Sequence, residues 1–389
     1  MLDINFTPQL NCPVCGGAGR RVIDLDSYPI TEIYVDWTPE FQRDGLLDQG
    51  YRYCDDCCHG YLERILDVRF IYQNYITTSA SSMGATACLK SFAEFIRTYV
   101  SVDDFRMMID IGGNDSTLLA DFAASPMKLV NIDPNATGGE RFEVIRCFLE
   151  DMDLDVYRSE EKKLVVSSHT IEHLARPEDL IRKIAGSLRP GDVCFLQFPS
   201  VERLVRFLRF DQICHQHLNY FSINSIEKLL VRHGLKVCEF EYDDQLYGTL
   251  RLMVAVDKGG AVEGSRRVRL TGNDVASGYK AFHAYYGRLN DTIAETFCGG
   301  TGFGAGLMVP TLAYHLDAVR HLDVIIDESP SKQGKRFINL APRIGPMADL
   351  DPREPVLVTS ISTKGTARAI AQKLASLGVQ NFVTPTLFW

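Results

Sequence analysis

Four cysteines near the start of the chain have the spacing of a metal site. Cys12 and Cys15 form one C-x2-C pair, and Cys54 and Cys57 form a second. Four thiolates complete the tetrahedral coordination of Zn²⁺ and leave no position open for a substrate. The gap between the pairs exceeds the ~15–20 residues usual in a zinc ribbon, and a strand pair within it can absorb the difference. We predict structural zinc here; buried thiols without a metal and a redox pair are the alternatives.

A second candidate site lies where an apolar run gives way to small and polar residues. Those residues are Asp110, Gly112, Gly113, Asn114 and Asp115. Glycines at the carboxyl end of a strand let the backbone turn tightly against a ligand. Asp133 ends the next apolar run, 23 residues after Asp110, and its carboxylate can accept hydrogen bonds from ribose hydroxyls. Because the segment departs from the G-x-G-x-x-G pattern of dinucleotide sites, it favours a nucleoside without phosphates, and S-adenosylmethionine is the obvious one. A tight turn with an acidic helix cap is the alternative.

Two groups of histidines follow. His169 and His173 come directly after the apolar run 162–168, and His215 and His217 lie in a later polar cluster. Imidazoles accept and donate protons near neutral pH, so acid–base chemistry or substrate binding is the first interpretation. Metal binding by His215 and His217 is an alternative, although such a pair faces one side only in extended backbone and no carboxylate joins it. Structural hydrogen bonding is the third interpretation.

The composition limits the class of protein. The chain has 389 residues, 41 basic and 50 acidic side chains, a net charge of −9 and 46% apolar residues. At about 100–200 residues per domain this length predicts two or three domains. The acidic balance gives no support to binding of a nucleic acid polymer, and no apolar run approaches the ~20 residues of a membrane helix. The start lacks a secretory signal, so we expect a cytoplasmic protein whose eleven cysteines are reduced or bind metal.

The elements that must position these residues fall into three zones. Residues 1–80 are rich in turn residues and predict a small zinc-binding module, and residues 258–389 predict a second α/β domain after a polar linker. Between them, residues 81–257 alternate strand-like and helical runs, which is typical of a doubly wound parallel sheet. The strand-like runs there are 107–113, 128–133, 162–169 and 192–198.

Several motifs make the chain similar to the S-adenosylmethionine-dependent C-methyltransferases of deoxysugar biosynthesis, which act on nucleotide-linked keto sugars. DIGGNDSTLL resembles the family's E-I-G-S-N-D-G-T-L-L, and IDPN matches its ribose-binding segment. HLNYFS resembles the end of Y-H-E-H-x-x-Y-F-S, and DESPSKQGK resembles D-D-S-P-x-K-Q-G-K. The resemblance covers nearly the whole chain. It implies an N-terminal zinc module, a class I methyltransferase domain with a Rossmann-like doubly wound sheet, and a C-terminal Rossmann-like α/β domain.

The resemblance also implies roles for individual residues. His217 is the candidate base, while His173 and Tyr75 are candidates for orienting the substrate or stabilising an enolate. Cys214 and Gln216 stand where the family has tyrosine and glutamate, on either side of His215. The residues implied for the cofactor are Asp110, Gly112, Gly113, Asn114, Asp115, Asp133, Ser168 and His169; those implied for the substrate are Tyr220, Arg251 and Lys332; and those implied for zinc are Cys12, Cys15, Cys54 and Cys57.

The expected reaction is methyl transfer from S-adenosylmethionine to a carbon α to a ketone, through an enolate, on a nucleotide-linked deoxysugar. It needs a base, a donor near the enolate oxygen and an aligned cofactor. The departure at Gln216 leaves open an O- or N-methyltransferase, or another S-adenosylmethionine-using transferase, on a non-sugar metabolite, because these reactions need less base strength. A non-catalytic binding protein on the same scaffold is a further alternative. The sequence is silent on oligomeric state and acceptor.

Overall fold

The computed structural model describes residues 5–67, 78–158, 161–244, 248–257, 268–360 and 364–385. Tyr75, a candidate for orienting the substrate, and residues 258–267 of the predicted linker lie outside these described residues.

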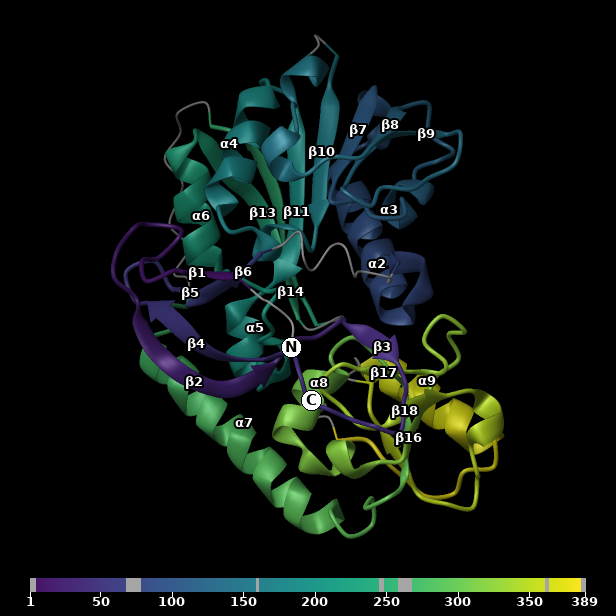
Figure 1. The fold of residues 1–389 in the computed structure, drawn as a ribbon. Coiled ribbons are helices and arrows are strands. Elements are labelled where there is room, and N and C mark those ends of the chain that lie inside the picture. Colours follow the sequence, from purple (N-terminus) through teal and green to yellow (C-terminus); the bar gives the residue numbers. More distant parts are fainter. Residues whose placement is uncertain are drawn as a thin grey trace.

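A seven-stranded sheet forms the centre of the upper half of the molecule (Figure 1). Its strand order is β13-β14-β11-β10-β7-β8-β9, and β14 alone runs antiparallel to its neighbours. The predicted doubly wound sheet is therefore confirmed. The strands are β7 (Met107–Ile111), β8 (Lys128–Ile132), β9 (Phe142–Ile145), β10 (Lys163–Ser168), β11 (Val193–Pro199), β13 (Leu235–Asp243) and β14 (Thr249–Val256).

Helices cover both faces of this sheet, so its strands are apolar on both sides. Met108 and Leu164 pack in one core with Phe92 of α2 (Met83–Tyr99). Their chain neighbours Ile109 and Val165 point the other way, into a core with the helices on the opposite face. The remaining helices of this region are α3 (Thr117–Ala120), α4 (Pro177–Ser187), α5 (Val201–Arg206) and α6 (Ile223–Arg232).

A four-stranded antiparallel sheet of order β12-β5-β4-β2 carries the cysteine pairs. Its strand β12 (Asn219–Tyr220) comes from the middle of the chain and pairs with β5 (His59–Leu62). That pairing fixes the polar histidine cluster against the N-terminal region. The other two strands of this sheet are β2 (Arg20–Pro29) and β4 (Leu46–Cys54). The N-terminal region also contains β1 (Phe6–Pro8) and β6 (Arg64–Leu66), which pair with each other, and β3 (Tyr34–Asp36).

The C-terminal region is a parallel sheet of order β18-β16-β15-β19-β20, which lies at the lower right of Figure 1. The order runs outward from β15 in both directions, as in a Rossmann-like fold, so the predicted second α/β unit is confirmed. The elements are α7 (Gly272–Ile293), β15 (Thr301–Phe303), α8 (Val309–His315), β16 (Val324–Ile326), β17 (Lys335–Phe337), β18 (Arg343–Gly345), β19 (Val356–Val358), α9 (Lys364–Ser376) and β20 (Phe382–Val383).

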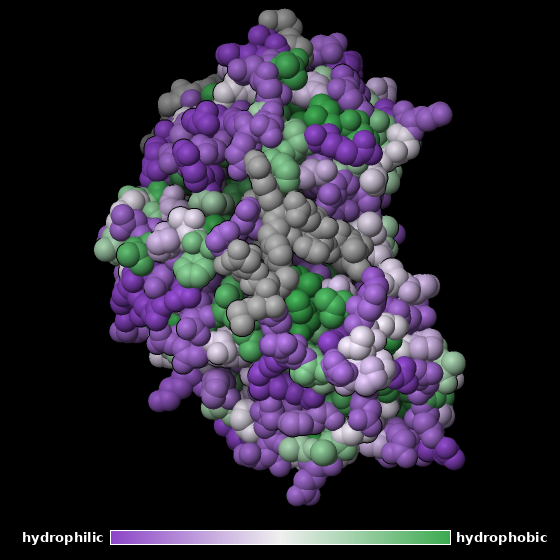
Figure 2. All heavy atoms as spheres, in the orientation of Figure 1, coloured by the Kyte–Doolittle hydropathy of each residue, from purple (hydrophilic) through white to green (hydrophobic). Residues whose placement is uncertain are grey.

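The three regions are tied together through shared structure. Strand β17 pairs with β3 of the N-terminal region. Phe282 of α7 packs in one core with Tyr51 of β4 and Leu204 of α5. The domain boundaries near residues 80 and 257 stay a prediction, because strands and cores cross them. Figure 2 shows a face dominated by hydrophilic residues, with apolar residues in separate patches. None of the helices in the described part of the chain is both long and apolar enough to cross a bilayer.

Candidate functional site

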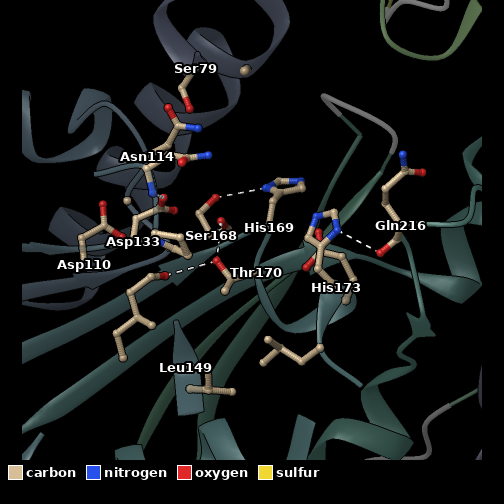
Figure 3. Close-up of a pocket in the computed structure, with 18 of the residues that line it drawn as sticks. Ser79, Asp110, Asn114, Asp133, Leu149, Ser168, His169, Thr170, His173 and Gln216 are labelled. Carbon is tan, nitrogen blue, oxygen red and sulfur yellow. Dashed lines mark hydrogen bonds between the residues drawn. The ribbon is translucent and has the colours of Figure 1, made fainter. Parts of the chain in front are cut away.

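A cavity of about 340 Å³ opens at the carboxyl ends of β7, β8 and β10. Figure 3 shows Asp110, Asn114 and Asp133 on one side of it and His169 and His173 on the other. Ligands bind at this edge in open α/β sheets because loops leave it in both directions. Of the sequence-predicted residues, those lining the cavity are Asp110, Gly112, Gly113, Asn114, Asp133, Ser168, His169, His173, Gln216 and His217.

The glycine turn after β7 is built as the sequence predicted. Gly112 has a φ of +80°, a left-handed conformation that glycine adopts without strain. A Cβ on Gly113 would lie 2.8 Å from Asp110 Oδ2, so the turn has no room for a side chain there. Burial, reinforced by the charge of Asp133, raises the pKa of Asp110 to about 8. Asp115 does not line the cavity; its carboxylate accepts hydrogen bonds from Thr117 and from the Ala80 N–H.

Asp133 lies at the end of β8, where a ribose is expected to bind. It is 8% exposed, and its Oδ1 accepts the N–H of Asn135 at 2.7 Å. Burial raises its pKa, partly opposed by the backbone hydrogen bonds it accepts. An apolar wall of Phe148, Leu149 and Met152 follows β9 and completes this side. The sequence analysis did not predict these three apolar residues as part of the site. Their position directly after the third consecutive strand, β9, could have indicated it, because ligands bind at the carboxyl ends of such strands.

The end of β10 brings a strained histidine to the cavity. His169 has a φ of +52°, which is unusual for a side-chain-bearing residue. Its Nδ1 lies 3.0 Å from Ser168 Oγ, which also accepts a hydrogen bond from Gln197 at 2.9 Å. Its Nε2 is buried without a hydrogen-bond partner. Burial, with smaller contributions from His173 and Arg251, lowers the pKa of His169 to about 3 and keeps the ring neutral.

His173 and His217 meet across the cavity wall with a carboxyl group that sequence reasoning missed. Their ring centroids are 4.9 Å apart at an interplanar angle of 74°. One nitrogen of each ring and one oxygen of Glu172 all lie within 4.8 Å of one another. The carboxyl group joins His217 to His173, and not to His215, with which His217 was considered as a metal-binding pair. Burial lowers the pKa of His173 to about 4 and that of His217 well below 6.5, and it raises the pKa of Glu172 to about 8.

Hydrogen bonds to backbone carbonyls hold the segment of Glu172 and His173 against the loop that carries His217. The Leu218 N–H donates to the Glu172 carbonyl at 2.8 Å, and His173 Nδ1 lies 3.0 Å from the Gln216 carbonyl. The Gln216 side chain is engaged elsewhere: Thr31 Oγ1 donates to its Oε1 at 2.9 Å, and its Nε2 donates to the Thr31 carbonyl at 3.2 Å. Gln216 thus anchors the histidine loop to the N-terminal region.

Several predicted site residues lie away from the cavity. His215 is buried, with its ring 3.2 Å from Gln49 Nε2 and 3.1 Å from the Tyr28 carbonyl. Arg251 is buried against Gln197 and Ser91, at 2.8 and 3.0 Å. The predicted residues outside the described cavity lining are Asp115, Cys214, His215, Tyr220, Arg251 and Lys332.

The C-terminal region reaches the cavity through apolar residues. Leu307 and Met308, between β15 and α8, line it. Lys332 lies elsewhere and donates to the Ala305 carbonyl at 2.9 Å. The roles predicted for Tyr220, Arg251 and Lys332 in substrate binding stay predictions.

The four predicted zinc ligands converge. Cys12 and Cys57 sulfur atoms are 3.4 Å apart, those of Cys15 and Cys54 are 3.6 Å apart, and those of Cys15 and Cys57 are 3.7 Å apart. Zn–S bonds of about 2.3 Å at tetrahedral angles put sulfur atoms about 3.8 Å apart, so the set fits zinc. A hydrogen bond from Cys57 lowers the pKa of Cys12 to about 4, which favours the thiolate that metal binding needs.

Comparisons with known proteins agree with this geometry. Residues 92–239, from α2 to β13, match the family described as a methyltransferase domain. The strand order and this match together confirm the predicted class I methyltransferase fold.

Individual relatives of the methyltransferase domain are distant. The chain is 22% identical over 265 residues to the C-methyltransferase NovU of Streptomyces niveus, covering 66% of this chain and 62% of that protein. The chain thus spans about three fifths of the length of the curated relative it matches. Two solved structures overlap it with TM-scores of 0.36. One is 1,6-didemethyltoxoflavin-N1-methyltransferase from Burkholderia thailandensis, which is 11% identical over 44% of this chain and 80% of that one. The other is magnesium protoporphyrin IX methyltransferase from Synechocystis PCC 6803, which is 12% identical over 45% of this chain and 84% of that one. At these scores the overlap carries no functional argument.

Proposed function

We propose that this protein transfers a methyl group from S-adenosylmethionine to a small-molecule acceptor. The observation that carries the proposal is the cavity at the carboxyl edge of the matched methyltransferase domain, with Gly112, Gly113 and Asp133 placed for a nucleoside. The Asp133 carboxylate can accept a ribose hydroxyl in addition to its backbone hydrogen bonds, and the apolar wall after β9 can hold the adenine. When bound, the cofactor supplies an electrophilic methyl group on its sulfonium.

We further propose that the acceptor atom is a carbon α to a ketone, on a nucleotide-linked sugar. The sequence motifs and the similarity to a C-methyltransferase support this finer assignment. Removal of a proton from such a carbon requires a base that is unprotonated before the reaction, which for a histidine is the neutral ring. The described cavity lining supplies three imidazoles that burial keeps neutral: His169, His173 and His217.

The other lining residues exclude water and position the acceptor. Leu307 and Met308 approach the cavity from the C-terminal region, opposite the cofactor turn. Exclusion of water strengthens each polar contact to a developing enolate. We also propose that the four cysteines bind one structural zinc ion, which fixes the N-terminal strands that hold Gln216 and its loop.

The test is methyl transfer with a panel of nucleotide-linked keto sugars, with S-adenosylhomocysteine measured and the product analysed by NMR. A new C–CH₃ signal is expected; an O–CH₃ or N–CH₃ signal would assign the second class of reaction. His217→Ala should reduce turnover about 10²- to 10⁴-fold while S-adenosylmethionine binds as in the wild type. His321→Ala, at an exposed histidine, is the matched control. Full activity of His217→Ala would reject the role of that side chain.

A further inference from the structure

Buried polar atoms in the cavity wall around Glu172 have no hydrogen-bond partners. Glu172 is 1% exposed, and neither carboxyl oxygen has a hydrogen-bond partner in the structure. His217 Nδ1 is also buried without a partner. A buried polar group without a partner destabilises the folded protein, and more so when it is charged. One oxygen of Glu172 and one ring nitrogen of each of His173 and His217 lie within 4.8 Å of one another, so a cation between them would supply a partner for these groups.

The charged side chains around the cavity also favour a bound cation. Five carboxyl groups line the described cavity, and no lysine or arginine does. An enolate, or any anionic acceptor, would therefore meet no cationic side chain among these described lining residues. The carboxyl-bearing residues are Glu32, Asp110, Asp133, Glu150 and Glu172.

We propose that Glu172, His173 and His217 bind one divalent cation, and that this cation holds the oxygen of the acceptor carbonyl. Two imidazoles and one carboxylate suit Zn²⁺, Mn²⁺, Fe²⁺ or Co²⁺ and leave positions open for other ligands. The inference rests on the proposed methyl transfer for the identity of the acceptor, whereas the cation site itself rests on the geometry of the three side chains.

The arrangement fits such an ion. Bonds of about 2.0–2.2 Å place ligand atoms about 3–3.5 Å apart; the three ligand atoms lie within 4.8 Å of one another, so small side-chain rotations close the set. His173 Nδ1 lies 3.0 Å from the Gln216 carbonyl. A donated Nδ1–H there leaves the Nε2 lone pair for the cation, and histidine ligands in metal sites are oriented in this way.

Hydrogen bonds also hold the segments that carry Glu172 and His217 in place. The Leu218 N–H to Glu172 carbonyl bond of 2.8 Å ties the carboxylate's segment to the loop that carries His217. On the far side, Gln216 anchors that loop to Thr31 through two hydrogen bonds. Ligand positions set by the backbone in this way favour a preorganised site.

With a cation bound, His217 and His169 have different roles in the reaction. A lone pair of His217 that binds a cation is unavailable to a proton, so His169, with its unpartnered Nε2, becomes the proton acceptor. The α proton passes to that nitrogen, the freed electron pair forms the bond to the methyl carbon, and the carbon–sulfur bond breaks to leave S-adenosylhomocysteine. The cation stabilises the negative oxygen of the enolate as a Lewis acid.

The experiment uses the full-length protein as purified. Metal analysis should find two ions per chain, one on the four cysteines and one at Glu172, and Glu172→Gln should lose one of them. After mild chelation, Mn²⁺ titration followed by EPR should show one bound ion in the wild type, with affinity about 10- to 100-fold weaker in Glu172→Gln and His217→Gln. His321→Ala should bind Mn²⁺ as the wild type does.

The outcomes are distinguishable. One ion per chain with no Mn²⁺ binding, or Mn²⁺ binding unchanged in Glu172→Gln, overturns the cation site and leaves methyl transfer standing. Two ions per chain, with Mn²⁺ binding that depends on Glu172 but no transfer to any acceptor, supports the site and rejects the proposed function. Calorimetric binding of S-adenosylmethionine by each variant checks that the fold is intact.

Discussion

The sharpest test of the cofactor site is the replacement Asp133→Asn. The carboxylate is 8% exposed, and one of its oxygens already accepts the Asn135 N–H at 2.7 Å. The amide oxygen of asparagine can keep that bond, whereas its NH₂ group replaces the oxygen available to a ribose hydroxyl. The substitution therefore removes one charge-assisted hydrogen bond to the cofactor, while the amide oxygen alone remains to accept the backbone hydrogen bonds from Asn135 and Asn114.

Such a bond contributes about 1.5–3 kcal/mol, which corresponds to an affinity about 10- to 150-fold weaker. The apoprotein should lose no stability, because burial already disfavours the charged form and raises the pKa of Asp133. Calorimetric titration with S-adenosylmethionine, together with a thermal melt of the apoprotein, measures both effects. We expect a higher Kd and an unchanged or higher Tm.

The matched control is Asp104→Asn, an exposed carboxylate that precedes β7 at the opposite edge of the sheet. Its Kd should stay within about twofold of the wild type. An Asp133→Asn variant that binds the cofactor with wild-type affinity would refute the placement of the ribose. A parallel fall in Tm would show instead that the substitution disturbs the turn.

Three further predictions concern stability and metal content. Because the folded-state pKa of Asp110 is about 8 against an ordinary 3.8, the stability of the apoprotein should fall as pH rises from about 4 to about 8. Asp110→Asn should flatten this fall in urea unfolding at pH 5 and pH 8, and an unchanged slope would contradict the reasoning. Lys163 is 0% exposed and its Nζ lies 2.7 Å from Asp192; Lys163→Met should destabilise the protein by about 3–5 kcal/mol, because it leaves a buried carboxylate unpaired. A loss under about 1 kcal/mol in denaturant unfolding would show that the pair is dispensable. Cys57→Ser should lower the zinc content by one ion per chain and reduce Tm, whereas the exposed Cys238→Ser should change neither; equal zinc in both variants would reject the four-cysteine site.

The short-range pattern of the sequence predicted much of the fold. The runs 107–113, 128–133 and 162–169 were predicted as strands, and they contain β7, β8 and β10 of the central sheet. The glycines after Ile111 form the tight turn expected of them. These features follow from residues that are neighbours in the chain, so spacing and residue type are sufficient to identify them.

The histidine cluster shows where such local reasoning ends. His215 and His217 are two residues apart, yet His215 is buried against Tyr28 and only His217 lines the described cavity. Gln216, read as a catalytic position, holds the loop to Thr31. The direction of each side chain depends on the irregular backbone of this loop, which residue periodicity does not predict.

The amino-acid sequence by itself therefore determined the class of fold, the four cysteines that converge and the glycine turn after β7. The tertiary structure alone decided which groups meet across the cavity. Glu172 joins His217, 45 residues away, because β12 pairs with β5 and the Leu218 N–H bonds to the Glu172 carbonyl. Contacts of this kind are set by strand pairing between distant segments, and their free energy depends on the whole packed structure rather than on local spacing.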